Sequence, residues 1–437
     1  MSDNIDRILK RGVTEVIVED DLRHMLEKGK PLRLKEGFDP SRPDIHLGHV
    51  VGLRKLRQFQ ELGHKVILIV GDWTAQIGDP SGQSQMRTML SAEEVKANAE
   101  TYMKQFFKVI DRDKTEVRWQ SEWFGNFSLA DVISLTSKFT VAQMLAREDF
   151  SKRYAAGQPI GITELLYPLL QAYDSVMIES DVEFGGIDQK FNCLMGRELQ
   201  EMMGQKPQQV FFTPLLVGLD GKMKMSKSLD NYIAVDEPPN DMYGKVMSLT
   251  DELIMDYFEL LTDVPDEELV EFQRQLKTDS INPMELKKRL AKEIVTEFHD
   301  SEAAQGAAEH FLKTVQQKEI PDEIPEISVG KLKELHRKAQ IESYRDGDEE
   351  TFEQSFLVEG REVLSQNPTD YFISIPLVLS ELGLAKSNSE ARRLIKQGSI
   401  QIIRREGDKS TVSEDRDSIQ VGDVIKAGKR RFLRIVE

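Results

Sequence analysis

Two short stretches carry the residues best suited to chemistry on a phosphate. The first is Lys224-Met225-Ser226-Lys227-Ser228, in which two lysines three residues apart are flanked by hydroxyl side chains. Ammonium and hydroxyl groups on a flexible loop can neutralise and hold a polyphosphate. Taken alone, the stretch also fits a solvated basic loop.

The second stretch is His46-Leu47-Gly48-His49, at the start of a helical pattern that runs to about residue 62. Two histidines three residues apart on the first turn of a helix share one face. Groups that donate hydrogen bonds at a helix N-terminus point to where an anion binds. A surface pair or part of a metal site is the alternative, but the sequence has no HExxH and no evident third ligand. We therefore expect no protein-ligated metal.

Alternating strands and helices surround these stretches. The run at 65–71 is short and continuously apolar, which is typical of a strand buried on both faces. Further strands are expected at 32–34, 117–119, 182–184 and 209–212, and helices at 5–29, 91–107, 128–147, 162–178 and 187–203. This order predicts an α/β fold with a doubly wound parallel sheet of the Rossmann type.

Ligands of such sheets bind at the carboxyl ends of the strands. The loops of His46, Asp79, Gly186 and Lys224 all begin at or shortly after the end of a predicted strand. We therefore expect them to share one crevice.

The chain divides into four regions. The α/β pattern occupies residues 1–232, and residues 233–325 show helical patterns only, which predicts an all-helical domain. Residues 326–370 contain a poorly patterned charged segment and are expected to form a linker. Residues 371–437 predict a small α+β domain.

Composition and charge restrict the function classes. The chain has 437 residues, a net charge of −17 and no apolar run approaching the roughly 20 residues of a membrane span. Its single cysteine, Cys193, excludes an internal disulfide and a cysteine cluster. No signal peptide is visible, so we expect a cytoplasmic protein without a membrane partner. Residues 371–437 carry 13 Lys and Arg against nine Asp and Glu, which favours an RNA-contacting module over a merely solvated face.

Both stretches together resemble the HIGH and KMSKS signatures of class I aminoacyl-tRNA synthetases. The resemblance narrows to the bacterial tyrosyl-tRNA synthetases through the segments 37–40, 78–82, 167–174 and 185–189. It covers the whole chain apart from about 330–370. The tail, 371–437, resembles the RNA-binding domain shared with ribosomal small-subunit protein S-four.

The resemblance implies a tyrosine–tRNA ligase. Such an enzyme activates tyrosine with ATP, in the presence of Mg²⁺, to tyrosyl-adenylate and pyrophosphate, and then transfers tyrosine to tRNA(Tyr). It further implies that residues 233–325 recognise the anticodon. It also implies a homodimer, to which Phe139, Val141, Met144 and Leu145 would supply an apolar contact.

Site residues are carried over from the family position by position. The resemblance implies that His46, His49, Lys224 and Lys227 are catalytic. The implied ATP-binding residues are Gly37, Asp39, Ser41, Gly48, Arg87, Gly186, Asp188, Met225, Ser226 and Lys227. The implied tyrosine-binding residues are Asp79, Tyr167, Gln171, Asp174 and Gln189.

Spacing supports the tyrosine side independently, because Tyr167, Gln171 and Asp174 fall on one face of a helix. A buried carboxylate at Asp174 could accept a hydrogen bond from the phenol and so reject phenylalanine. For Asp39 the simpler interpretation is a turn residue, and for Tyr167 it is core packing.

Two positions depart from the family pattern. Lys35 stands where the family often has a tyrosine that contacts the phenol, and Gln83 stands where a lysine is expected. Phenol recognition should therefore rely more on Asp174.

Three alternatives remain at this point. A tryptophanyl-tRNA synthetase relative shares both signatures but lacks the tail domain. A non-catalytic RNA-binding homologue would not need His46, His49, Lys224 and Lys227. A nucleotidyltransferase with the HxGH fold would be shorter and would lack the helical domain.

Overall fold

A computed structural model of the chain describes residues 2–40, 44–80, 90–316, 324–335, 371–405, 408–428 and 431–437. The chain forms two compact units, Met1–Ala307 and Ala308–Glu437, each of which is described by itself. Ser41, Gln83 and Arg87 lie outside the described residues. Within the described ranges, no helix has the length and apolar character needed to cross a membrane.

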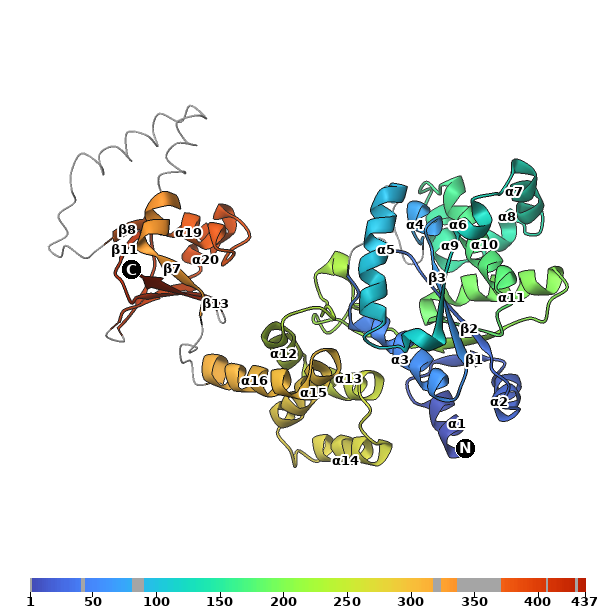
Figure 1. Ribbon diagram of the computed structural model, residues 1–437, viewed down its shortest axis with the longest axis horizontal. Coiled ribbons are helices and arrows are strands. Elements are labelled where there is room, and N and C mark those ends of the chain that lie inside the picture. The colour runs from blue at the N-terminus through green and yellow to red at the C-terminus, as the bar shows by residue number, and fades with distance from the viewer. Residues whose placement is uncertain are drawn as a thin grey trace. The chain divides into compact units, whose positions relative to one another are not determined.

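The first unit is built on a six-stranded sheet (Figure 1). Its strand order is β1 (Glu15–Ile17), β6 (Gln209–Thr213), β5 (Val182–Gly186), β2 (Arg33–Phe38), β3 (Lys65–Val70) and β4 (Thr115–Trp119). All neighbours are parallel except β1, which pairs antiparallel with β6. The predicted doubly wound sheet is confirmed, with one added antiparallel edge strand.

Helices cover both faces of this sheet because each parallel connection crosses over one face. α3 (Leu47–Glu61) and α5 (Ala92–Phe106) lie on one side, and α10 (Ile162–Met177) and α11 (Lys190–Met202) lie on the other (Figure 1). Both faces of the sheet are accordingly covered: the last five residues of β3 and all five of β6 are buried.

The edge strand β1 differs from the prediction of one helix over 5–29. Gly12 adopts a left-handed φ of 61°, which ends the helical path after α1 (Ser2–Lys10), and α2 (Glu19–Glu27) begins only after the strand. Three half-buried residues between two helices give too short a pattern to be recognised in the sequence.

The region 121–155 contains four short helices, α6 (Ser121–Phe124), α7 (Leu129–Thr136), α8 (Val141–Leu145) and α9 (Glu148–Ala155). Ser128 and Thr140 cap α7 and α8 by accepting hydrogen bonds from the backbone three residues on. Each cap starts a new helix, so the helical pattern over 128–147 is divided.

Five helices follow the sheet: α12 (Pro239–Met247), α13 (Ile254–Leu261), α14 (Asp266–Lys277), α15 (Pro283–Phe298) and α16 (Ser301–Phe311). The helical pattern expected in residues 233–325 is interrupted at His299, whose φ of −124° and ψ of −103° are not helical. Arg54 and Arg57 on α3 form ion pairs of 2.6–2.8 Å with Asp263, which follows α13, and with Glu297 on α15, and so join these two segments to α3.

The second unit contains a five-stranded sheet of order β10 (Lys409–Thr411), β9 (Ile400–Ile403), β12 (Val424–Ala427), β13 (Arg431–Val436) and β7 (Glu326–Ser328). A two-stranded sheet of β8 (Tyr371–Ser374) and β11 (Arg416–Ile419) and the helices α19 (Ile375–Glu381) and α20 (Asn388–Lys396) complete it. β7 pairs parallel with β13, and Ile327 and Leu332 lie in the apolar core. Residues 326–335, which we expected in the linker, therefore belong to this sheet unit.

Candidate active site

A pocket of about 660 Å³ lies at the carboxyl ends of β2 and β5. At this point the chain order of the strands reverses, since β3 and β4 lie on one side of β2, and β5 and β6 lie on the other. Ligands of α/β sheets bind at such a reversal. Every predicted site residue that the structure describes lines this pocket: Gly37, Asp39, His46, Gly48, His49, Asp79, Tyr167, Gln171, Asp174, Gly186, Asp188, Gln189, Lys224, Met225, Ser226 and Lys227.

The two histidines lie at the start of α3, where each side chain accepts a hydrogen bond from a backbone N–H group of the first turn. His46 is the N-cap, and its Nδ1 accepts a hydrogen bond of 3.1 Å from the backbone N–H of Gly48. The Nδ1 of His49 accepts one of 3.2 Å from the backbone N–H of His46. A Cβ on residue 48 would lie 2.9 Å from the His46 ring, so the glycine makes this cap possible.

Both imidazoles are held in the neutral form. Burial and, second, the ammonium group of Lys227 together lower the pKa of His49 to about 4. Burial, His49 and the two lysines hold the pKa of His46 still further below its usual value. Because each Nδ1 is an acceptor, each neutral ring carries its proton on Nε2, which is left to donate to an anion.

The lysine loop closes the same end of the pocket. Lys224 donates a hydrogen bond of 2.8 Å from Nζ to Oδ2 of Asp188, and the Nζ of Lys227 lies 5.5 Å from the centre of the Tyr102 ring. Asn231 fixes the loop by accepting from the backbone N–H of Ser226 and by donating to the carbonyl of Lys224. Asp188 thus orients the side chain of Lys224, and the Tyr102 ring lies beside that of Lys227.

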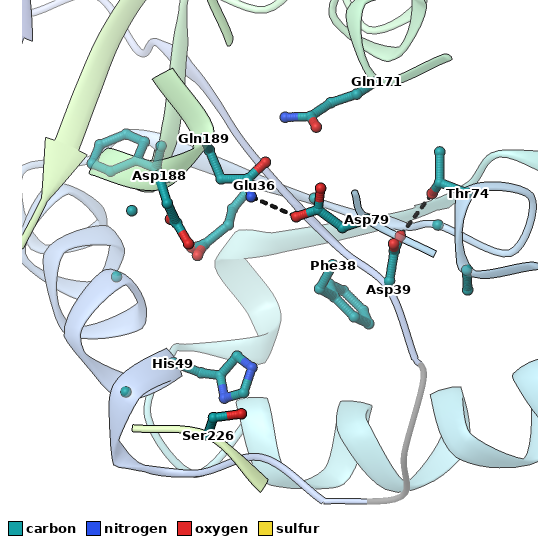
Figure 2. A pocket seen from close by; sticks show the side chains of 18 of the residues that line it. Glu36, Phe38, Asp39, His49, Thr74, Asp79, Gln171, Asp188, Gln189 and Ser226 are labelled. Carbon is teal, nitrogen blue, oxygen red and sulfur yellow. Dashed lines mark hydrogen bonds between the residues drawn. The ribbon is translucent and has the colours of Figure 1, made fainter. Parts of the chain in front are cut away.

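Asp39 links two segments of the pocket wall, the turn at Thr74 and helix α10. Its Oδ1 accepts a hydrogen bond of 2.7 Å from the Thr74 hydroxyl, and its Oδ2 accepts one of 2.9 Å from the Tyr167 hydroxyl. Figure 2 shows the Asp39–Thr74 bond beside Asp79. Burial and the Asp39 carboxylate hold the pKa of Tyr167 well above its usual value, so the phenol stays protonated.

Asp174 lies at the buried end of the pocket. Its two oxygens accept hydrogen bonds of 2.8 Å from Gln120 Nε2 and 3.1 Å from Trp123 Nε1. Burial nevertheless raises the pKa of Asp174 to about 7, since desolvation outweighs these donors and the nearby charge of Lys35. The carboxyl group therefore changes charge near neutral pH.

Sequence reasoning missed several residues that shape the site. Thr74, Gln120 and Trp123 hold the two aspartates, but each sits in a short helix or turn whose packing onto the pocket has no sequence signal. Glu36 also lines the pocket, and burial raises its pKa to about 8. Its Oε2 has no hydrogen-bond partner within the described part of the chain. Glu36 lies beyond the strand expected at 32–34, so no sequence signal pointed to it.

A doubly wound domain with an HxGH turn and a KMSKS loop at one pocket defines a class I aminoacyl-tRNA synthetase. The family described as tRNA synthetases class I (W and Y) matches residues 27–316. The chain therefore belongs to the tryptophanyl and tyrosyl family of class I tRNA synthetases.

Two similar proteins carry the name of one of these two enzymes, tyrosine–tRNA ligase. The chain is 57% identical over 432 residues to the tyrosine–tRNA ligase of Dehalococcoides mccartyi strain CBDB1, covering 99% of this chain and 98% of the relative. It is 48% identical over 431 residues to that of Thermotoga maritima, covering 98% and 96%. The crystal structure of Archaeoglobus fulgidus tyrosyl-tRNA synthetase complexed with L-tyrosine is similar at a TM-score of 0.57 and 25% identity, covering 70% of this chain and 99% of that one.

The neutral histidines predict a pH response. In an NMR titration of histidine-labelled protein, we expect the His46 and His49 rings, assigned from H46N and H49Q, to stay neutral through pH 6.5, because their pKa values are lowered. The unfolded chain, which serves as the control, takes up these protons near pH 6.5. The free energy of unfolding should therefore fall as the pH decreases from about 6.5 towards 4. A ring that protonates near pH 6.5 in the folded protein would contradict this assignment.

Proposed function

We propose that the chain is a tyrosine–tRNA ligase. It activates tyrosine with ATP to tyrosyl-adenylate and pyrophosphate and then transfers tyrosine to the terminal ribose of tRNA(Tyr). The observation that carries this proposal is the single pocket lined by the histidine turn, the lysine loop and the Tyr167–Asp174 face of α10. The names of the relatives support the choice of amino acid.

In the first step, a carboxylate oxygen of tyrosine attacks the α-phosphorus of ATP, and the bond to the bridging oxygen of pyrophosphate breaks. The reaction needs no protein nucleophile, so catalysis consists of positioning and charge stabilisation. The Nε2–H groups of His46 and His49 and the ammonium groups of Lys224 and Lys227 donate to the phosphate oxygens. The two histidines are fixed by their hydrogen bonds at the start of α3 before the reaction, so these two donors need little reorganisation as negative charge develops.

ATP lies between the ends of β2 and β5 on this proposal. Gly37, Gly48 and Gly186 let the nucleotide approach the backbone, while Asp188 and Asp39 contact its polar groups. The remaining proposed contacts come from Ser41, Arg87, Met225 and Ser226.

Mg²⁺ arrives with ATP and supplies further charge neutralisation when bound. Among the described residues, no three His, Cys, Asp or Glu side chains are grouped so that they could hold a metal ion. The oxygens of the polyphosphate would hold this ion, because Mg²⁺ prefers substrate phosphates and water as ligands.

Tyrosine occupies the other half of the pocket. Its ammonium group is held by Asp79, Tyr167 and Gln171, with Gln189 beside them. Gln189 supports this arrangement by donating a hydrogen bond of 2.7 Å to Asp79. The phenol donates to Asp174, which lies between Gln120 and Trp123. A phenylalanine would remove the phenol as the third donor to this buried carboxyl group, and the lost hydrogen bond is costly.

The other regions have proposed roles in assembly and tRNA binding. Residues 233–325 recognise the anticodon, and the basic tail, 371–437, binds RNA. The proposed homodimer uses α7 and α8, where Leu129, Ile133 and Val141 are 75%, 59% and 64% exposed. Phe139 and Met144 are buried in the core of the first unit, so the exposed residues supply the apolar contact in their place.

ATP–pyrophosphate exchange with each amino acid in turn tests the proposed function. We expect exchange that depends on tyrosine, because Asp174 and its two donors form a buried site for a phenol. Exchange that depends on tryptophan would identify the tryptophanyl alternative, and no exchange with any amino acid would favour a non-catalytic homologue.

The lysine loop predicts a kinetic defect without a binding defect. K227A should slow tyrosyl-adenylate formation about a hundredfold, since a donor to the developing pyrophosphate is lost. The dissociation constant of tyrosine should change less than about twofold. K222A, an exposed lysine just before the loop, is the matched control. Pre-steady-state kinetics measure both quantities, and a large loss of tyrosine affinity in K227A would refute the role of the loop.

The raised pKa of Asp174 predicts a pH-dependent tyrosine KM. Below about pH 7 the carboxyl group is protonated, and above it the stronger carboxylate acceptor forms. The KM for tyrosine should therefore fall as the pH rises from about 6 to 8. D174N should remove this dependence and reduce the preference for tyrosine over phenylalanine at least about tenfold. An unchanged preference in D174N would place phenol recognition elsewhere.

A further inference from the structure

A buried ion pair lies behind the tyrosine half of the pocket. Lys35 on β2 and Glu183 on β5 are direct neighbours across the parallel strands, and their side chains are 0% and 2% exposed. Their Nζ–Oε1 distance is 2.9 Å. Taking two charges out of water is costly, and an apolar pair of similar volume is often as stable. The pair therefore needs an explanation beyond stability.

Lys35 forms hydrogen bonds with two residues of α10. In addition to Glu183, its ammonium group donates to the backbone carbonyl of Gln171 at 2.8 Å and to the hydroxyl of Ser175 at 2.7 Å. These three acceptors use all three ammonium protons. Lys35 thus stands where the family often has a phenol-contacting tyrosine, but here it fixes the helix turn that carries Gln171.

Glu183 sets the direction of the Gln171 amide. The Nε2 of Gln171 donates to Oε1 of Glu183 at 3.1 Å. A carboxylate only accepts hydrogen bonds, so the NH₂ group must face it and the amide oxygen must face the other way. That oxygen accepts a hydrogen bond of 3.1 Å from Nδ2 of Asn192 on α11.

Asn192 connects the amide of Gln171 to that of Gln189, which lies beside the proposed ammonium site. Arg147 donates to its Oδ1 at 3.2 Å, which turns both Nδ2 protons towards the pocket side chains. One proton goes to Gln171 and the other to Oε1 of Gln189, at 3.0 Å. Gln189 in turn donates from Nε2 to Asp79 at 2.7 Å. Figure 2 shows Gln171, Gln189 and Asp79 around the same part of the pocket.

We propose that Lys35, Glu183 and Asn192 are positioning residues that set the amide orientations of Gln171 and Gln189 for an amino-acid ammonium group. This inference rests on the proposed function of the pocket. An ammonium group has three donors and no acceptor. The Gln171 oxygen and the Asp79 carboxylate attract it, whereas a reversed Gln171 would present an NH₂ group and repel it. The chain of hydrogen bonds, anchored by Glu183 at one end and Arg147 at the other, excludes that reversal.

N192D tests the proposal most directly. The new carboxylate keeps the contact with Arg147, so the fold should hold, but it cannot donate to either glutamine. Each glutamine amide then lies between two carboxylates, residue 192 on one side and Glu183 or Asp79 on the other, so neither amide keeps a single favoured orientation. We expect the KM for tyrosine in ATP–pyrophosphate exchange to rise about tenfold or more, with kcat and the KM for ATP little changed. E183Q should act in the same direction, because its side-chain amide no longer specifies the orientation of Gln171.

The control is K65M, which breaks the exposed ion pair between Lys65 and Glu116 in the same sheet and should leave every constant unchanged. Two tyrosine analogues separate positioning from general damage. Tyramine keeps the ammonium group, so its inhibition constant should rise in N192D as the KM for tyrosine does. Deaminated tyrosine lacks the ammonium group and should inhibit N192D as well as it inhibits the wild-type enzyme.

Each outcome decides the proposal. An unchanged tyrosine KM in folded N192D, equal weakening of both analogues, or loss of folding in N192D would overturn it. If only E183Q fails to fold, N192D decides alone. A wild-type chain that exchanges with tryptophan refutes the proposed function instead, and the orientation of the amides is then tested with the KM for tryptophan.

Discussion

The reversal of strand order beside β2 is the constraint on which the site depends. Chain segments leave the sheet in opposite directions there, so the ends of β2 and β5 diverge and leave a crevice between them. The turn before α3, the end of β5 and the lysine loop reach this crevice from different parts of the sequence. A fold that moved either strand would separate the histidines from the lysines.

Burial then decides the charge state of the groups around the crevice. It keeps His46 and His49 neutral, keeps Tyr167 protonated and brings Asp174 to a pKa of about 7. On the proposed function, the positive charge that meets the phosphates comes from Lys224 and Lys227, and the histidines complement it as neutral donors. Two kinds of donor thus act together without like-charge repulsion between four cations.

Features that depend on neighbouring residues in the sequence could be predicted, whereas features that depend on contacts between distant segments could not. Apolar runs and helical spacing predicted five of the six strands of the first unit's sheet, because these patterns are local. The residues of the pocket lining came from the resemblance to the synthetase family. The edge strand β1 and the donors Gln120 and Trp123 depend on contacts between distant segments. Lys35 was recognised as a departure, but its partner Glu183 became evident only from the pairing of β2 with β5.

The Lys35–Glu183 pair also restricts how this sequence can change. Replacing either residue alone leaves a charge buried without its partner, which is more damaging than replacing both. No single substitution of Lys35 or Glu183 is therefore expected to be neutral. The two residues are expected to be replaced together or to be retained together. The buried ion pair would then hinder evolution between a site that contains the two charges and one that has uncharged residues at both positions.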